Sequence, residues 1–282
     1  MTDLEHDIDV IRRWAIRNPV IQRVHIFGSR VRGTERADSD LDVAVEHGVM
    51  LGDGDHTTTG LFGHSEWQSE LQPLCRCQLQ VESYRPGETP TVEAGIKESS
   101  RLILDRATQM DNARRMYDEA LARIHDAHIL ANPVLNAQSD ASAHLGILGF
   151  EILLKTAVFL AGCPRDRLDY SHRYFDIWNK LPTADRAEIL KTARARMPHH
   201  ADLSDIRRVL NAWQYVFEQG RYYYELYENW TLDQQHEFGE YWLEIGGPIE
   251  EADIKYYPQE LTCMIDALKA YLEPRLRSRP AQ

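Results

Sequence analysis

The sequence has little of the residue types that define fibrous, disordered or disulfide-stapled chains. Of its 282 residues only 16 are glycine, 12 are proline and 4 are cysteine, whereas 43% are hydrophobic and 27% are charged. This composition excludes a collagen-like, low-complexity or disordered chain. At this length we expect two domains of ordinary size, each with its own core.

Basic residues are also scarce. The chain has 32 Lys and Arg against 44 Asp and Glu, which gives a formal net charge of −12. This balance disfavours a broad basic face for duplex nucleic acid. The first residues are acidic and lack the apolar stretch of a secretory signal, so we expect a cytoplasmic protein.

Long apolar runs without charge are missing too. The longest apolar stretch, residues 144–162, contains Glu151 and Lys155, which predicts a buried helix and no membrane partner. The scattered cysteines fit a reducing compartment. Cys75 and Cys77 form a C-x-C pair, but no second pair follows at zinc-finger spacing, so a zinc site is disfavoured.

Hydrophobic periodicity divides the chain into two parts. Before about residue 105 it alternates between helix and strand, with helices expected at 4–18, 64–74 and 91–106, strands at 20–27, 41–45 and 78–84, and a loop at 51–63. Beyond it, helices are expected at 108–131, 136–162, 172–181, 184–196, 203–229 and 258–276. We therefore predict an α+β protein, with a small mixed-sheet domain at 1–106 and an all-α helical bundle at 107–282.

The turn after the first predicted strand is the first candidate site. Residues 27–33 read FGSRVRG, and such a turn offers backbone N–H groups, a hydroxyl and a helix start to a phosphate. Arg30 and Arg32 add positive charge there, although both equally fit surface residues paired with Glu35 or Asp38. The candidate phosphate-binding residues are Gly28, Ser29, Arg30, Arg32 and Gly33.

Two carboxylates begin the second predicted strand. Asp40 and Asp42 are two residues apart, so they point to the same face while Leu41 and Val43 point to the core. Neighbouring carboxylates repel unless a cation lies between them, and ligands made only of oxygen suit magnesium.

Two-metal phosphoryl transfer commonly uses a third carboxylate, which holds the second ion and takes a proton. Strand parity places Glu82 on the polar face of the third predicted strand, and Glu46 and Glu93 are alternatives nearby. The candidate catalytic and metal-binding residues are Asp40, Asp42 and Glu82.

Gly28-Ser29-x-x-x-Gly33 followed by Asp40-x-Asp42 resembles the signature of the DNA polymerase beta-type nucleotidyltransferases, in its minimal form. The resemblance covers about the first 105 residues. It implies transfer of a nucleoside monophosphate from a nucleoside triphosphate, with ATP expected, to a hydroxyl, with two Mg²⁺ ions and release of pyrophosphate. Glu82 departs from the family, in which Asp is usual at the third position.

The helical half resembles HEPN domains over roughly residues 108–276, on the apolar helix with Glu151 and Lys155 and the Ser171-His172 helix start. The resemblance implies nucleotide binding and a homodimer through this domain. Some HEPN proteins are ribonucleases with an Arg-x(4 to 6)-His motif, which Arg167-x4-His172 and Arg194-x4-His199 match. Cap and packing roles are the favoured interpretation of these residues.

Aromatic residues are frequent at 213–230. They could form a platform on which bases stack, but at helical spacing we favour a hydrophobic core or a dimer interface.

The leading hypothesis is a magnesium-dependent nucleotidyltransferase. Its acceptor would be a protein, a transfer RNA or a small molecule of the aminoglycoside type, to which an acidic protein is suited. The alternatives are a nucleotide-sensing or toxin and antitoxin partner-binding module and, third, a HEPN-type ribonuclease.

Overall fold

The computed structural model describes residues 2–36, 38–48, 65–132, 140–163, 172–219, 229–247 and 255–277. The chain divides into two compact units. The first comprises Met1–Arg114, Phe159–Pro164 and Leu276–Gln282, and the second Arg115–Val158 and Arg165–Arg275. The helix α5 (Arg106–Leu130) contributes residues to both.

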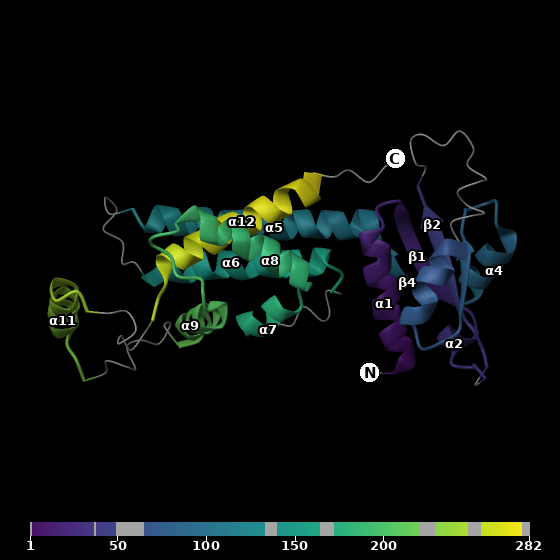
Figure 1. The fold of residues 1–282 in the computed structure, drawn as a ribbon, viewed down its shortest axis with the longest axis horizontal. Helices are drawn as coiled ribbons and strands as arrows, with labels where there is room; N and C mark the ends of the chain where they lie inside the picture. The colour runs from purple at the N-terminus through teal and green to yellow at the C-terminus, as the bar shows by residue number, and fades with distance from the viewer. Residues whose placement is uncertain are drawn as a thin grey trace. The chain divides into compact units, whose positions relative to one another are not determined.

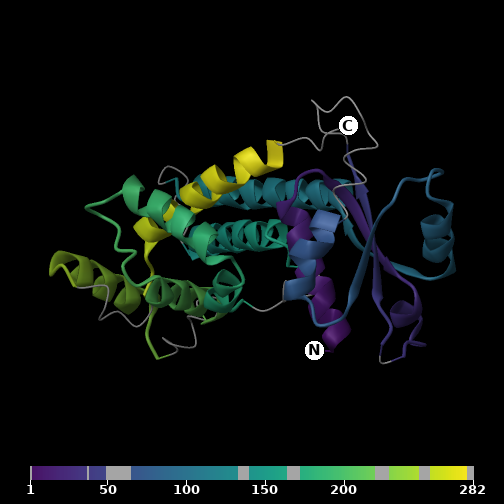
Figure 2. The same ribbon diagram turned by 45° about the vertical axis from the view of Figure 1, so that its right-hand side comes forward.

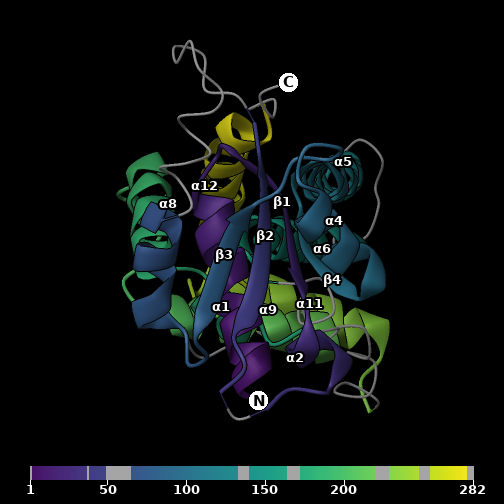
Figure 3. The ribbon, with the colours of Figure 1, turned by 90° about the vertical axis from the view of Figure 1, so that its right-hand side faces the viewer.

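The first unit is built on a four-stranded mixed sheet in the order β3-β2-β1-β4 (Figure 3). The strand β1 pairs antiparallel with both β2 and β4, whereas β2 and β3 are parallel. This arrangement, followed by a mostly helical region, confirms the predicted α+β class. The strands are β1 (Ile21–Phe27), β2 (Leu41–His47), β3 (Leu79–Ser83) and β4 (Ser100–Asp105).

The core lies on one face of this sheet. Apolar residues alternate along each strand, and the helix α1 (Asp3–Arg17) covers that face together with the helix at 65–71. The other face meets α4 (Pro90–Glu98), where Phe27, Ala44 and Val92 form a smaller cluster. Figure 2 shows α1 and α4 on opposite sides of the strands. Much of the second face therefore remains available for polar side chains.

The expected helix at 91–106 is wrong in its second half. The helix α4 ends at Glu98, and Ser100–Asp105 forms β4 instead. Residues 102–104 are a short apolar run, which periodicity alone does not assign to helix or strand. Pairing with β1 along Arg23–Phe27 satisfies the backbone of this segment and decides the outcome.

The helices described beyond residue 130 are drawn in Figure 1. They lie close to the predicted ones, except that the sequence predicts no helix at 232–244, where the structure has one. The buried side chains of the second unit include Phe150, Tyr174, Trp178 and Trp213. The described part of the predicted 203–229 helix ends at Gln219, and 220–228 and the predicted 51–63 loop lie outside the described residues. The helices are α6 (Asp140–Leu160), α7 (Tyr174–Asn179), α8 (Thr183–Arg196), α9 (Ile206–Gln219), α11 (Leu232–Glu244) and α12 (Pro258–Arg277).

Among the described helices, α6 is long and apolar enough to cross a membrane by length and composition. In this structure 61% of its most apolar window is buried inside the protein. The charged Glu151 lies within it and is itself buried. Its place in the fold is therefore that of a core helix, as the sequence predicts.

The carboxylate of Asp7 joins α1 to the segment that leads into β3. It is fully buried and accepts hydrogen bonds from the backbone N–H groups of Arg76 (2.9 Å) and Cys77 (2.8 Å) and from His6 Nδ1 (3.0 Å). Burial raises the pKa of Asp7, but these hydrogen bonds outweigh it and the net pKa is lowered. The charged form of Asp7 therefore stabilises the fold and sets where β3 begins.

We predict that Asp7→Asn lowers the free energy of unfolding at pH 7 by about 3 kcal/mol, because an amide cannot accept all of these buried hydrogen bonds. The folded pKa of Asp7 is lowered, so its contribution is complete above an unfolded pKa of about 3.9 and is lost as pH falls through the folded value. Urea unfolding should show the difference between variant and wild type shrinking below about pH 4. Asp3→Asn, which removes an exposed ion pair with Arg76, should cost under about 1 kcal/mol. Equal losses for the two variants would contradict this role.

Candidate active site

The glycine turn and the second aspartate meet at the end of β1. Phe27, the last residue of β1, pairs with Asp42 in β2. The chain then turns at Gly28, which has a φ of 84°, into the short helix α2 (Ser29–Arg32). A Cβ atom at Gly28 would overlap Asp42 Oδ2. Only glycine therefore allows the backbone both this conformation and this approach to the carboxylate.

Gly33 closes the same turn. It has a φ of 70°, and its N–H donates to the carbonyl of Ser29. No atom lies within 4 Å of the position of its Cβ, so the backbone conformation, and not crowding, favours glycine here. The five-residue spacing between the two glycines thus encloses one tight helical turn.

The charges of Asp40 and Glu82 act on Asp42, which lies on the sheet face that meets α4. In the parallel pairing of β2 with β3, Asp42 faces Gln80 and Ala44 faces Glu82. Burial raises the pKa of Asp42, and the charges of Glu82 and Asp40 raise it further, against an opposing effect of Arg32. The structure thus places all three predicted carboxylates near one another and makes negative charge at Asp42 costly.

The two alternatives for the third carboxylate have other partners. Glu46 forms an ion pair with Arg23 across β1 and β2 (3.2 Å). Glu93 pairs with Lys97 on α4 (2.7 Å) and accepts a hydrogen bond from the Gly87 N–H. Of the three glutamates, it is Glu82 whose charge acts on Asp42.

The two arginines of the turn have different partners from those the sequence suggested. Arg30 donates from Nε (2.8 Å) and Nη2 (2.6 Å) to the carbonyl of Ser39, which fixes the residue before Asp40. Arg32 forms an ion pair with Glu98 at the end of α4 (3.3 Å). Arg30 thus supports the position of the first aspartate, and Arg32 contributes charge near Asp42.

Among the described residues, no three His, Cys, Asp or Glu side chains are close enough to hold a metal ion unaided. The two cysteines of the C-x-C pair, Cys75 and Cys77, are not joined in a disulfide. Burial, with the nearby charge of Asp7, raises the pKa of Cys75 to about 12. A thiol with such a pKa stays protonated at neutral pH and is a weak nucleophile.

In the helical unit, Glu151 is the centre of a buried polar cluster. It accepts from Lys155 Nζ (2.6 Å), His172 Nδ1 (2.8 Å) and the Tyr174 hydroxyl (3.1 Å). The ring of His172 packs on Phe217 at 4.5 Å between centroids. This arrangement agrees with a packing role for His172, and Arg167 and Ser171 lie outside the described residues.

The other Arg-x4-His pair, Arg194 and His199, spans the end of α8. Arg194 donates through Nε and Nη2 to the carbonyl of Leu203 (3.3 and 2.8 Å). His199 is exposed in the turn after α8. Arg194 therefore anchors the segment that follows its helix.

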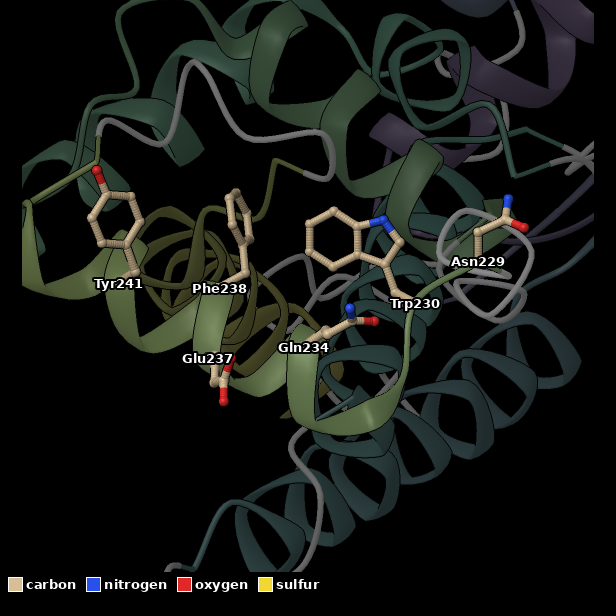
Figure 4. Close-up of a pocket in the computed structure, with 6 residues that line it drawn as sticks. All are labelled: Asn229, Trp230, Gln234, Glu237, Phe238 and Tyr241. Atoms are coloured by element: carbon tan, nitrogen blue, oxygen red, sulfur yellow. The ribbon is translucent and has the colours of Figure 1, made fainter.

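The aromatic run divides between core and surface. Trp213 and Phe217 are buried in the helical unit, as favoured from the sequence. Trp230, by contrast, is 41% exposed and lies beside Phe238 and Tyr241 along a shallow groove of about 400 Å³ (Figure 4). The tyrosines at 222–224 and 227 lie outside the described residues. The groove is lined by residues 229–241, in a part of the chain where the sequence predicts no helix beyond residue 229.

Two polar residues near the candidate site were not chosen as site residues from the sequence. Gln80 occupies the position directly across from Asp42, and its side chain contacts Glu82. Ser39 supplies the carbonyl that holds Arg30. The alternation along the third strand puts Gln80 on the same face as Glu82, so this pattern could have identified Gln80 as a candidate site residue.

Comparison with known proteins supports the same region. Residues 9–109 match the family model described as "Polymerase beta, Nucleotidyltransferase". This match and the small mixed sheet identify a nucleotidyltransferase domain of that type in the N-terminal part of the chain, and support nucleotidyl transfer as its general activity. Comparisons with curated proteins and with solved structures found no match.

We predict that Gly28→Ala lowers the free energy of unfolding by about 1–3 kcal/mol, because alanine is strained at this positive φ and its Cβ collides with Asp42. Gly33→Ala is the matched control, since it shares the positive φ but meets no neighbouring atom. Gly28→Ala should therefore displace the Asp42 carboxylate, seen as a shift of its ¹³C NMR signal, and Gly33→Ala should not. An unmoved Asp42 signal in folded Gly28→Ala would contradict the close approach.

Proposed function

We propose that the protein is a magnesium-dependent nucleotidyltransferase that moves a nucleoside monophosphate from a nucleoside triphosphate to an acceptor hydroxyl. The observation that carries the proposal is the contact of the Gly28 turn with Asp42, beside Asp40 and Glu82. A glycine turn that leads into a helix presents backbone N–H groups of the kind that suit a triphosphate, and adjacent carboxylates suit the cations that accompany it. The matched family model supports this general chemistry.

The donor set fits magnesium. All three candidate ligands are carboxylates, and magnesium keeps several waters and is completed by substrate phosphates. This explains why the described side chains need not enclose a metal ion by themselves. Bound there, magnesium would neutralise charge on the triphosphate and the transferred group.

Each residue of the site has a proposed task. Gly28 and Ser29 hold the triphosphate through the turn, and Gly33 keeps the turn closed. Asp40 and Asp42 bind metal, and Arg30 keeps Asp40 in place through Ser39. Arg32 supplies positive charge near Asp42.

Glu82 completes the metal site and takes the acceptor proton. The acceptor oxygen forms a bond to the α-phosphorus while the bond to the pyrophosphate oxygen breaks. The proton of the hydroxyl passes to the carboxylate, and pyrophosphate leaves with its electron pair.

The acceptor is proposed as a class. A protein, a transfer RNA and a cationic small molecule all offer hydroxyl groups, and the net charge of −12 favours the last by attraction. The helical unit is proposed as a HEPN-like domain that orients the acceptor and pairs with a second copy, in a cytoplasmic protein that uses ATP.

We predict that Asp42→Asn lowers transfer of label from α-³²P nucleoside triphosphates by about 100-fold or more, since electrostatic stabilisation at the reacting phosphate is lost. The four triphosphates are offered with Mg²⁺ to a cell extract and to a panel of aminoglycosides. Asp111→Asn, at an exposed carboxylate paired with Arg114, is the control and should transfer at the wild-type rate.

Label that appears only with intact Asp42 would support the transferase and reveal its acceptor class. Triphosphate binding by calorimetry without label in any fraction would overturn the transferase and favour a nucleotide-sensing module.

A further inference from the structure

Glu82 does not lie directly across from Asp42, so its side chain has to span the distance between them. Asp42 faces Gln80 across the β2–β3 pair, and Glu82 lies two residues further along β3. Neighbouring strands are about 4.8 Å apart and rise about 3.3 Å per residue, so the backbone of Glu82 lies about 8 Å from that of Asp42. A carboxylate there meets Asp42 only if its side chain leans back along β3.

The length of glutamate suits this offset. Directly across from Glu82 lies Ala44, whose small side chain is fully buried. It therefore presents no bulk that would hold Glu82 away from Asp42. The extra methylene of glutamate, relative to aspartate, adds reach along the strand direction.

A hydrogen bond turns Glu82 in the required direction. The amide Nε2 of Gln80 donates to Glu82 Oε1 at 2.8 Å. An ionised carboxylate only accepts hydrogen bonds, so the amide nitrogen has to be the atom that faces it. Because Gln80 lies directly opposite Asp42, this bond draws the Glu82 carboxylate toward the Asp42 end of β3.

We propose that Gln80 is a positioning residue that holds the Glu82 carboxylate toward Asp42 and thereby raises the affinity of the site for divalent cations. The inference rests on the proposed function and extends it to a residue that touches no reacting atom. Partners that orient metal ligands typically change metal affinity by about 10- to 100-fold. The Gln80 bond is solvent-exposed, so we expect the lower end of this range.

The test uses Mn²⁺ in place of Mg²⁺, and free Mn²⁺ is measured by electron paramagnetic resonance with the full chain and α,β-methylene ATP. Gln80→Met keeps the length of the side chain but donates no hydrogen bond, and should raise the Kd for Mn²⁺ about tenfold. Gln235→Met is the control, because the amide of Gln235 also donates a solvent-exposed hydrogen bond, to the Trp230 carbonyl, but the residue lies in the second unit. Its Kd should equal that of the wild type.

A double-mutant cycle shows whether Gln80 acts through Glu82. In a Glu82→Gln background, Gln80→Met should leave the Kd for Mn²⁺ unchanged. A tenfold effect that persists there, or no effect in the wild-type background, would overturn the positioning role. Thermal unfolding of each variant should match the wild type, because both side chains lie at the surface of the sheet.

The outcomes separate this inference from the proposed function. Wild-type Mn²⁺ binding that Asp42→Asn abolishes but Gln80→Met leaves intact would overturn the role of Gln80 and leave the transferase standing. Absence of Mn²⁺ binding by the wild type, with and without the nucleotide, would overturn both.

Discussion

The register of β2 with its two neighbours is the constraint on which the site depends. Pairing with β1 puts the glycine turn against Asp42, and pairing with β3 puts Gln80 and Glu82 on the same face. A shift of one residue in either pair would turn these side chains into the core, since neighbouring residues of a strand point to opposite faces. The apolar residues of the other parity lock this register by packing under α1. The stability of the core and the geometry of the site are therefore set by the same alternation.

The sheet also explains how repelling charges are kept together. Asp42 is held in partial burial beside two other carboxylates, which raises its pKa. Backbone pairing holds the strands in place despite this repulsion, so the repulsion destabilises the charged form of Asp42. The cation of the proposed function would offset it. On the opposite side of the fold, the buried Asp7 is stabilised by two backbone N–H groups. The first unit thus contains Asp7, a carboxylate whose charge is stabilised by hydrogen bonds, and the carboxylates of the candidate site, whose charges repel.

The sequence predicted the parts of this structure that short-range patterns control. Alternating apolar residues predicted β1, β2 and β3, and the spacing of Gly28, Asp40 and Asp42 indicated the candidate site. Strand β4 was missed because the short apolar run at 102–104 fits a helix as well as a strand. Only its pairing with β1 decides for the strand. Two hydrogen bonds were not predicted from the sequence. The bond from Gln80 to Glu82 depends on strand geometry, and the bond from Arg30 to the Ser39 carbonyl depends on the path of a loop. The HEPN-like nature of the helical half stays a prediction.

The most direct measurement of the central claim is an amide ¹H–¹⁵N NMR titration of the full chain with α,β-methylene ATP and Mg²⁺. If register brings the turn and the carboxylates into one triphosphate site, the signals of Gly28, Ser29 and Gln80 shift together, with a single Kd. The same shifts should be absent in Asp42→Asn. Shifts confined to residues of the helical unit, or shifts at Gly28 that persist unchanged in Asp42→Asn, would contradict the account.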